Sequence, residues 1–179
     1  PAVSGTYTYT VSLSRSGCAV RTAQVSVTVG NCGGGPCGDG VRVAESLSSP
    51  VAGLRYSYYE HMWSRSVSEI EGKTPVAQAV VGQFSLAPRQ KPDYFGFEYT
   101  GYINIPADGQ YSFYTSSDDA SRLWIGSTEV VNNDFMQGMT ERSGQICLAR
   151  GWHPIRVRYI QGAGGLGLQV SWQGPGVAK

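Results

Sequence analysis

Charged residues are scarce in this sequence, and the two signs nearly balance. Only 15% of the 179 residues are charged, and the 14 basic and 13 acidic residues form no run of either sign. Nucleic-acid binding needs a concentrated basic surface, so we expect no nucleic-acid partner. Long apolar runs are also missing, so we expect no membrane insertion.

Apolar residues at helical spacing are rare, whereas short alternating runs are frequent. Glycine (24) and tyrosine (11) are abundant, a composition typical of strands and turns. From residue 41 onward, runs such as "GLRYSYYEHMW", "VAQAVVGQFSL" and "SRLWIGSTEVV" follow one another between turn signals, and a polar stretch near residues 64–70 could form a brief helix. The sequence predicts an all-β protein, either a β-sandwich or a barrel.

Cysteine and histidine are too few and too irregularly spaced for a zinc site. No pair of cysteines has C-x-x-C spacing, and only two histidines could supplement them. We therefore expect disulfides, which favour a secreted or cell-surface protein. The four cysteines are Cys18, Cys32, Cys37 and Cys147.

The disulfide connectivity stays open between several possibilities. A hairpin formed by residues 5–13 and 20–29 would leave Cys18 and Cys32 too far apart to bond, at about 3.3 Å per residue. Cys32–Cys37 could form together with Cys18–Cys147, or Cys18–Cys37 together with Cys32–Cys147. A third possibility is that Cys18 bonds a cysteine outside this sequence.

The first 40 residues differ in pattern from the remainder. Residues 1–30 contain two alternating runs around "SRSG", which predict a β-hairpin. An isolated hairpin is marginal in water, so this one must pack on the rest or end a truncated neighbouring module. It resembles the last strands of the immunoglobulin-like or PKD-like modules of bacterial surface proteins. Residues 31–40, "NCGGGPCGDG", predict a linker to a domain over residues 41–179.

Two stretches carry a more specific resemblance. They are "YTGYINIPADGQYSFYTSSDDASRLWIG" and "GWHPIRVRYIQGAGGLGLQVSW". Both resemble the PA-14 family, named for a domain of anthrax protective antigen, and the resemblance runs from roughly Gly53 to Pro175. It implies a β-sandwich of the kind found in bacterial and yeast adhesins, toxins and glycoside hydrolases.

Asp118 and Asp119 stand next to each other inside a strand pattern. Neighbouring side chains of a regular strand point to opposite faces, so they could not share one ion. In lectin-like members of the family, such as yeast flocculins and epithelial adhesins, a cis peptide bond joins the paired aspartates, which bind calcium together with sugar hydroxyls. The resemblance thus implies that Asp118 and Asp119 bind Ca²⁺ and carbohydrate. Without it, two adjacent aspartates would more often mark a solvated turn.

Calcium needs about six to eight oxygen ligands, so other oxygens must join the aspartates. The glycine-rich loop "QGAGGLG" (161–167) is the expected source. The resemblance assigns to the metal the Gln161 side chain and the backbone oxygens of Ala163 and Gly165. It assigns Gln161 and Gly164, with both aspartates, to the sugar. The chain departs from the family at Ala120, where glycine is frequent.

An enzyme is not expected from these residues. A glycosidase needs two carboxyl groups roughly 5–9.5 Å apart on either side of the scissile bond, which adjacent aspartates sharing a metal do not provide. His61 and His153 are interpreted as structural. Any of the four tryptophans could stack on a sugar, although strand-borne tryptophans are most often core residues.

The preferred hypothesis is a calcium-dependent glycan-binding domain of a secreted or surface bacterial adhesin, monomeric as an isolated domain. A structural spacer or protein-interaction module that lacks sugar binding is the alternative. A further alternative is an accessory carbohydrate-binding domain of a glycoside hydrolase. Calcium dependence separates the first hypothesis from the spacer.

Overall fold

The computed structural model describes residues 5–13, 21–29, 37–38, 40–63 and 66–179. Its contacts divide the chain into two compact units, Pro1–Gly40 and Val41–Lys179. In the first unit, β1 (Gly5–Leu13) and β2 (Arg21–Val29) pair in antiparallel register. The alternating pattern of residues 1–30 predicts this hairpin.

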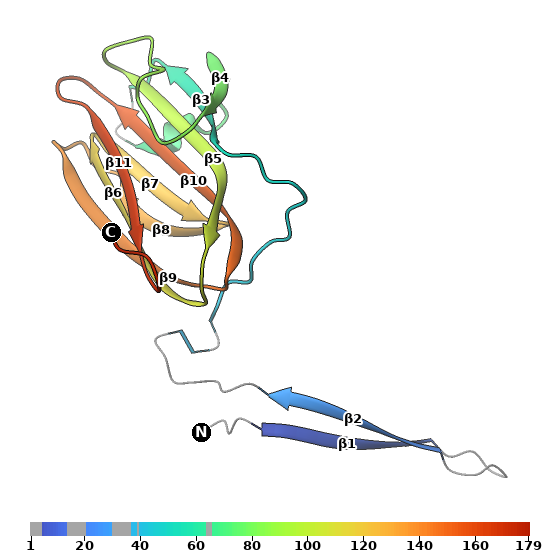
Figure 1. The fold of residues 1–179 in the computed structure, drawn as a ribbon. Helices are drawn as coiled ribbons and strands as arrows, with labels where there is room; N and C mark the ends of the chain where they lie inside the picture. Colours follow the sequence, from blue (N-terminus) through green and yellow to red (C-terminus); the bar gives the residue numbers. More distant parts are fainter. Residues whose placement is uncertain (1–4, 14–20, 30–36, 39, 64–65) are drawn as a thin grey trace. The chain divides into compact units, whose positions relative to one another are not determined.

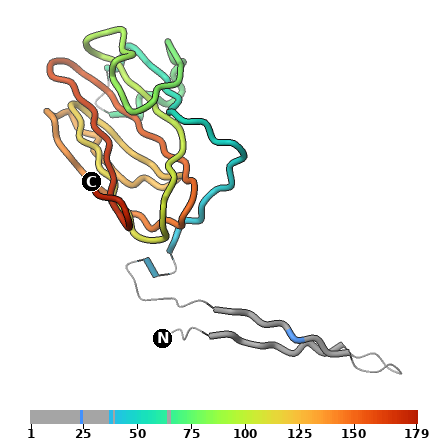
Figure 2. Tube along the Cα trace, viewed as in Figure 1, coloured from blue at the N-terminus to red at the C-terminus, as the bar shows by residue number. Residues whose placement is uncertain are grey.

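The second unit is a β-sandwich, which confirms the all-β prediction (Figures 1 and 2). One sheet has six strands in the order β4-β3-β5-β10-β7-β8, and the other has three in the order β11-β6-β9. Neighbouring strands pair antiparallel throughout both sheets. The elements are β3 (Leu54–Glu60), the short 3₁₀ helix η1 (Val67–Ile70), β4 (Ala77–Val81), β5 (Phe95–Ile105), β6 (Gly109–Asp118), β7 (Ala120–Ile125), β8 (Thr128–Asn133), β9 (Thr140–Leu148), β10 (Gly151–Gln161) and β11 (Gly167–Gln173).

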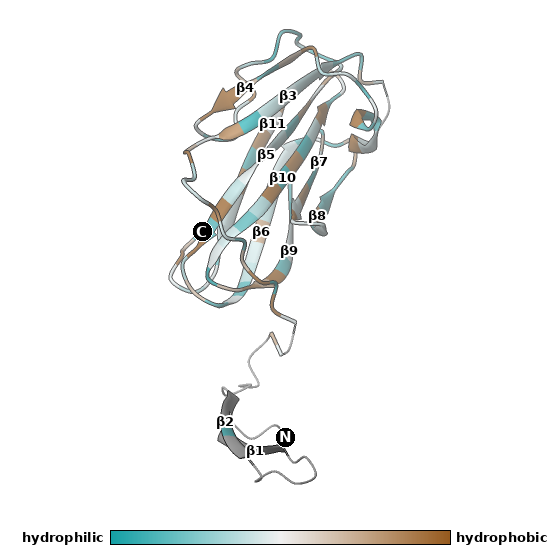
Figure 3. Cartoon of the chain, turned by 90° about the vertical axis from the view of Figure 1, so that its right-hand side faces the viewer, coloured by the Kyte–Doolittle hydropathy of each residue, from teal (hydrophilic) through white to brown (hydrophobic). Residues whose placement is uncertain are grey.

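Aromatic side chains fill the space between the sheets. Along β6, and along β10 as far as Tyr159, every second residue is buried, as a strand with one face toward the core requires. Figure 3 shows this on β10, where hydrophobic and hydrophilic positions follow each other. The fully buried aromatic residues are Tyr58, Phe95, Phe97, Tyr99, Tyr111, Phe113 and Tyr159. Their large apolar area makes them the main source of core stabilisation.

Strand register brings the ends of five strands together at one end of the sandwich. Gln161 at the end of β10 lies opposite Phe95 at the start of β5, and the adjacent Ile160 lies opposite Ala120 at the start of β7. Gly167 at the start of β11 lies opposite Asp118 at the end of β6. The paired aspartates and the 161–167 loop therefore lie at the same end of the sandwich.

Residues 41–45 lie against the opposite ends of β9 and β10. Arg42 donates its backbone N–H to Cys147 O (2.9 Å), and its guanidinium lies 2.7 Å from Nδ1 of the buried His153. Because guanidinium can only donate, Nδ1 accepts and Nε2 donates to Ala149 O (2.7 Å). His153 therefore has a structural role here.

Cys37 and Cys147 are both disulfide-bonded. The connectivities left open by the sequence also involve Cys18 and Cys32, which lie outside the described residues. Among the described residues, no helix is long and apolar enough to cross a bilayer.

Candidate functional site

A cis peptide bond joins Asp118 and Asp119 where β6 ends and β7 begins. This is the arrangement that the resemblance implies for the pair. Ala120, at a position where glycine is frequent in the family, is buried and is not among the residues with positive φ. Alanine is therefore compatible with the backbone at this point.

Both carboxylates face the 161–167 loop. The backbone N–H of Gly162 donates to Oδ2 of Asp119 (2.7 Å). A Cβ added at Gly165 would lie 2.6 Å from Oδ2 of Asp118, so a larger residue at position 165 would have to displace the Asp118 carboxylate. Register and loop conformation together place the two aspartates beside the residues predicted to complete the site.

The side chain of Gln161 is buried at the base of this loop. Its Nε2 donates to the backbone oxygen of Gly165 (2.7 Å), and its Oε1 accepts from the Tyr159 hydroxyl (2.7 Å). The same hydroxyl also lies within hydrogen-bond distance of the Asp118 backbone oxygen. Gln161 Oε1 and the backbone oxygen of Gly165, both predicted metal ligands, thus each accept one hydrogen bond already and keep a second lone pair.

Ala163 and Gly164 lie at the exposed tip of the loop. Gly164 has φ +99°, a conformation that side chains disfavour, and its N–H donates to Oδ1 of Asp93 (3.3 Å). Every residue predicted for the site therefore lies at this end of the sandwich.

Burial and like charge act on the titrating groups of the site. The pKa of Asp118 is raised, first by desolvation and then by the negative charge of Asp119. Burial also raises the pKa of Tyr159, and both aspartates raise it further, so its hydroxyl stays protonated and can donate. No group of three or more His, Cys, Asp or Glu side chains suited to a metal occurs in the described part of the chain. Any cation here would need backbone or amide oxygens besides the two carboxylates.

The sequence did not indicate the role of Asn133, at the end of β8. Its buried side chain donates to Thr140 O (2.8 Å) and accepts from the Gln137 amide (2.6 Å), which closes the base of the loop 134–139. The backbone N–H of Gln137 in turn donates to Oδ1 of Asp119 (3.3 Å). Asn133 therefore positions this loop against the aspartate. Its one sequence signal was a polar residue at an inward-facing strand position.

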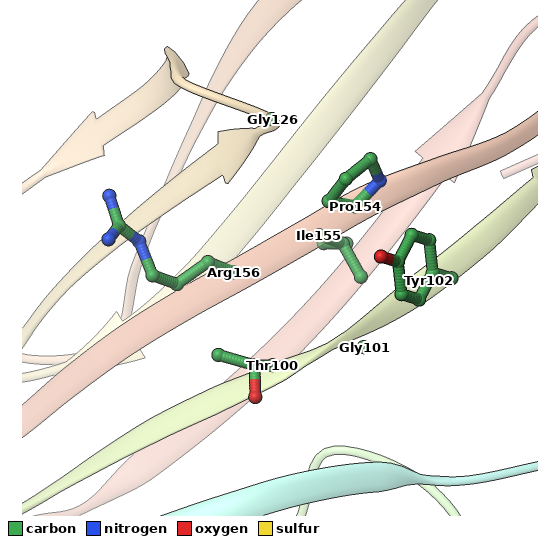
Figure 4. A pocket seen from close by; sticks show the side chains of 7 residues that line it. All are labelled: Thr100, Gly101, Tyr102, Gly126, Pro154, Ile155 and Arg156. Atoms are coloured by element: carbon green, nitrogen blue, oxygen red, sulfur yellow. The ribbon is translucent and has the colours of Figure 1, made fainter. Parts of the chain in front are cut away.

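A separate hollow of about 410 Å³ lies over the six-stranded sheet (Figure 4). It is lined by Thr100, Gly101, Tyr102, Gly126, Pro154, Ile155 and Arg156. Pro154 is seven residues along β10 from Gln161, or roughly 23 Å at strand spacing. No carboxylate lines this hollow, and Arg156 is its charged lining residue.

The profile of the PA14 domain family matches residues 50–179. Among curated relatives, the anti-sigma-I factor RsgI3 of Acetivibrio thermocellus is 27% identical over 122 residues, which are 68% of this chain and 19% of that protein. This chain therefore corresponds to about a fifth of the relative's length.

Solved structures share the sandwich. A PA14 sugar-binding domain from an RTX adhesin has a TM-score of 0.56 at 21% identity, covering 72% of this chain and 93% of that one. The A domain of epithelial adhesin 9 from Candida glabrata, in complex with Galb1-4GlcNAc, has a TM-score of 0.59 at 12% identity, covering 78% and 90%. At these identities the likeness is one of fold.

Proposed function

This chain belongs to the PA14 domain family, and we propose that its sandwich binds carbohydrate through a calcium ion held by Asp118 and Asp119. One observation carries the proposal: two adjacent carboxylates face the same glycine-rich loop, Asp119 through a hydrogen bond from Gly162 N–H and Asp118 against Gly165. Calcium prefers such hard oxygen donors. The proposal makes residues 41–179 a binding module, without a catalytic step.

The chain supplies a donor set that fits calcium. The two carboxylates would neutralise the ion's charge, while Gln161 Oε1 and the backbone oxygens of Ala163 and Gly165 would add neutral ligands. With one oxygen from each carboxylate, these groups would supply five of the six to eight oxygens that calcium takes. The remaining positions would accept sugar hydroxyls, with Gly164 at the exposed tip lining the sugar.

Two fold neighbours support this assignment, since one is a sugar-binding domain and the other is bound to Galb1-4GlcNAc. We place the domain in a secreted or surface protein of adhesin type. A shallow, exposed site makes few contacts, so affinity for one sugar should be weak, and repeated domains on a surface would raise it by avidity.

Calcium removal should abolish glycan retention. We expect the protein to bind at least one sugar on a glycan array in millimolar calcium and none after EDTA treatment. Saturating calcium at about 100 times its dissociation constant should also stabilise the fold by about 2.7 kcal/mol, because the ion binds only the folded site. If EDTA changes neither the glycan retention nor the thermal midpoint of the protein, the proposal is contradicted and the spacer hypothesis is favoured.

A further inference from the structure

We propose a second sugar subsite next to the 161–167 loop, formed by the adjacent, tilted rings of Trp63 and Tyr94. The inference rests on the proposed function and extends it: the ligand would be an oligosaccharide, with one ring at the calcium ion and a neighbouring ring over the aromatic pair. The subsite would add affinity only for glycans of at least two rings.

The aromatic pair is exposed, unlike most large rings of this protein. Trp63 is 65% and Tyr94 41% exposed, and their ring centroids lie 4.5 Å apart. They line a hollow of about 220 Å³ together with Glu60, His61, Lys91 and Asp93. An apolar ring face beside charged side chains suits a sugar, since a pyranose presents C–H groups on its face and hydroxyls at its edge.

Backbone contacts hold the pair in place before any ligand arrives. Met62, between His61 and Trp63, donates its N–H to Tyr94 O (3.0 Å), while Trp63 N–H donates to Oε1 of Glu69 (3.1 Å). His61 and Tyr94 have φ +59° and +56°, values that non-glycine residues rarely adopt. Such conformations cluster at ligand sites, where the surrounding structure enforces them.

Two hydrogen bonds tie the aromatic pair to the loop of the proposed calcium site. Tyr94 N–H donates to Gly162 O (2.7 Å), and Asp93 accepts from Gly164 N–H (3.3 Å). Gly162 also donates to Asp119, so one loop residue contacts both the aspartate and the aromatic segment. The segment that carries Tyr94 is therefore hydrogen-bonded directly to the 161–167 loop, whereas a chance exposed aromatic residue need not be.

The test compares Trp63→Ala with the unchanged protein on an array of monosaccharides and of di- and trisaccharides built from them, in calcium. We expect the unchanged protein to prefer at least one disaccharide over its terminal monosaccharide, on the order of tenfold, the size of one favourable aromatic contact at an interface. Trp63→Ala should lose that preference and keep its monosaccharide affinity and its calcium affinity. Trp63→Phe should retain part of the preference.

Tyr102→Ala is the matched control, because Tyr102 is 44% exposed but lies by the other hollow. It should leave the disaccharide preference unchanged. Failure of the subsite and failure of the proposed function give different results. Calcium-dependent binding without a disaccharide preference, or a preference that survives Trp63→Ala, overturns the subsite alone. Loss of monosaccharide binding in Trp63→Ala also overturns it, and the absence of any calcium-dependent glycan binding overturns both.

Discussion

Asp119→Ala is expected to abolish calcium binding and calcium-dependent glycan binding, and to destabilise the metal-free domain as well. The change removes a proposed ligand, and it also leaves the backbone N–H groups of Gly162 and Gln137 without their acceptor. A buried donor left unsatisfied costs about 1–3 kcal/mol. Titration calorimetry would measure the loss of calcium binding, and a thermal melt in EDTA would measure the loss of stability.

Asp119→Asn separates these two effects. The amide keeps one oxygen that can accept from a backbone N–H, but it removes the negative charge. We expect Asp119→Asn to lose calcium binding with a smaller drop in thermal midpoint than Asp119→Ala shows. If both variants bind calcium as tightly as the unchanged protein does, Asp119 is a hydrogen-bond acceptor for the two loops and not a metal ligand.

Gly144→Ala should be the most damaging single-methyl substitution in the sandwich. A Cβ at Gly144, in β9, would lie 1.6 Å from the backbone oxygen of Val130 in β8. The obstacle is main chain, so it cannot rotate away and the strands must separate. Overpacking of this kind costs typically about 1–3 kcal/mol and occasionally more. We expect a thermal midpoint lower by about 2–8 °C for each kcal/mol lost.

Gly138→Ala is the control for this prediction. A Cβ there would meet nothing within 4 Å, and its φ is not positive. Its thermal midpoint should stay unchanged or rise slightly, because alanine restricts the unfolded chain. Equal midpoints for the two variants would show that β8 and β9 do not approach as closely as the structure places them. The contact also matters for the site, since these strands hold the loop 134–139 against Asp119.

The strands were predictable because their signal is local. Alternation of apolar and polar residues gave β6 and β10, and the adjacent aspartates in an otherwise regular strand pointed to the site. The 161–167 loop was also predictable, since the resemblance extends over it. These features depend on short stretches of sequence and on a motif whose residues lie together.

The contacts that build the site were not predictable in the same way. The hydrogen bond from the Tyr159 hydroxyl to Gln161 depends on how side chains meet where β10 ends. The contacts of the buried Asn133 side chain with Thr140 and Gln137 likewise depend on where the loop 134–139 folds back. Among the tryptophans, Trp124 is 9% exposed, as expected for a core residue on a strand. Trp63 follows β3 and meets Tyr94 only because the register of distant strands brings them together.

Calcium titration of the metal-stripped protein by calorimetry is the most direct measurement, carried out alongside Asp118→Asn. We predict saturable binding to one site in the unchanged protein, with a dissociation constant up to about 10⁻³ M, as in extracellular calcium modules. Asp118→Asn should show none while melting at nearly the same temperature in EDTA. No binding in the unchanged protein, or equal binding in both, would contradict the assignment of Asp118 and Asp119 to a calcium ion.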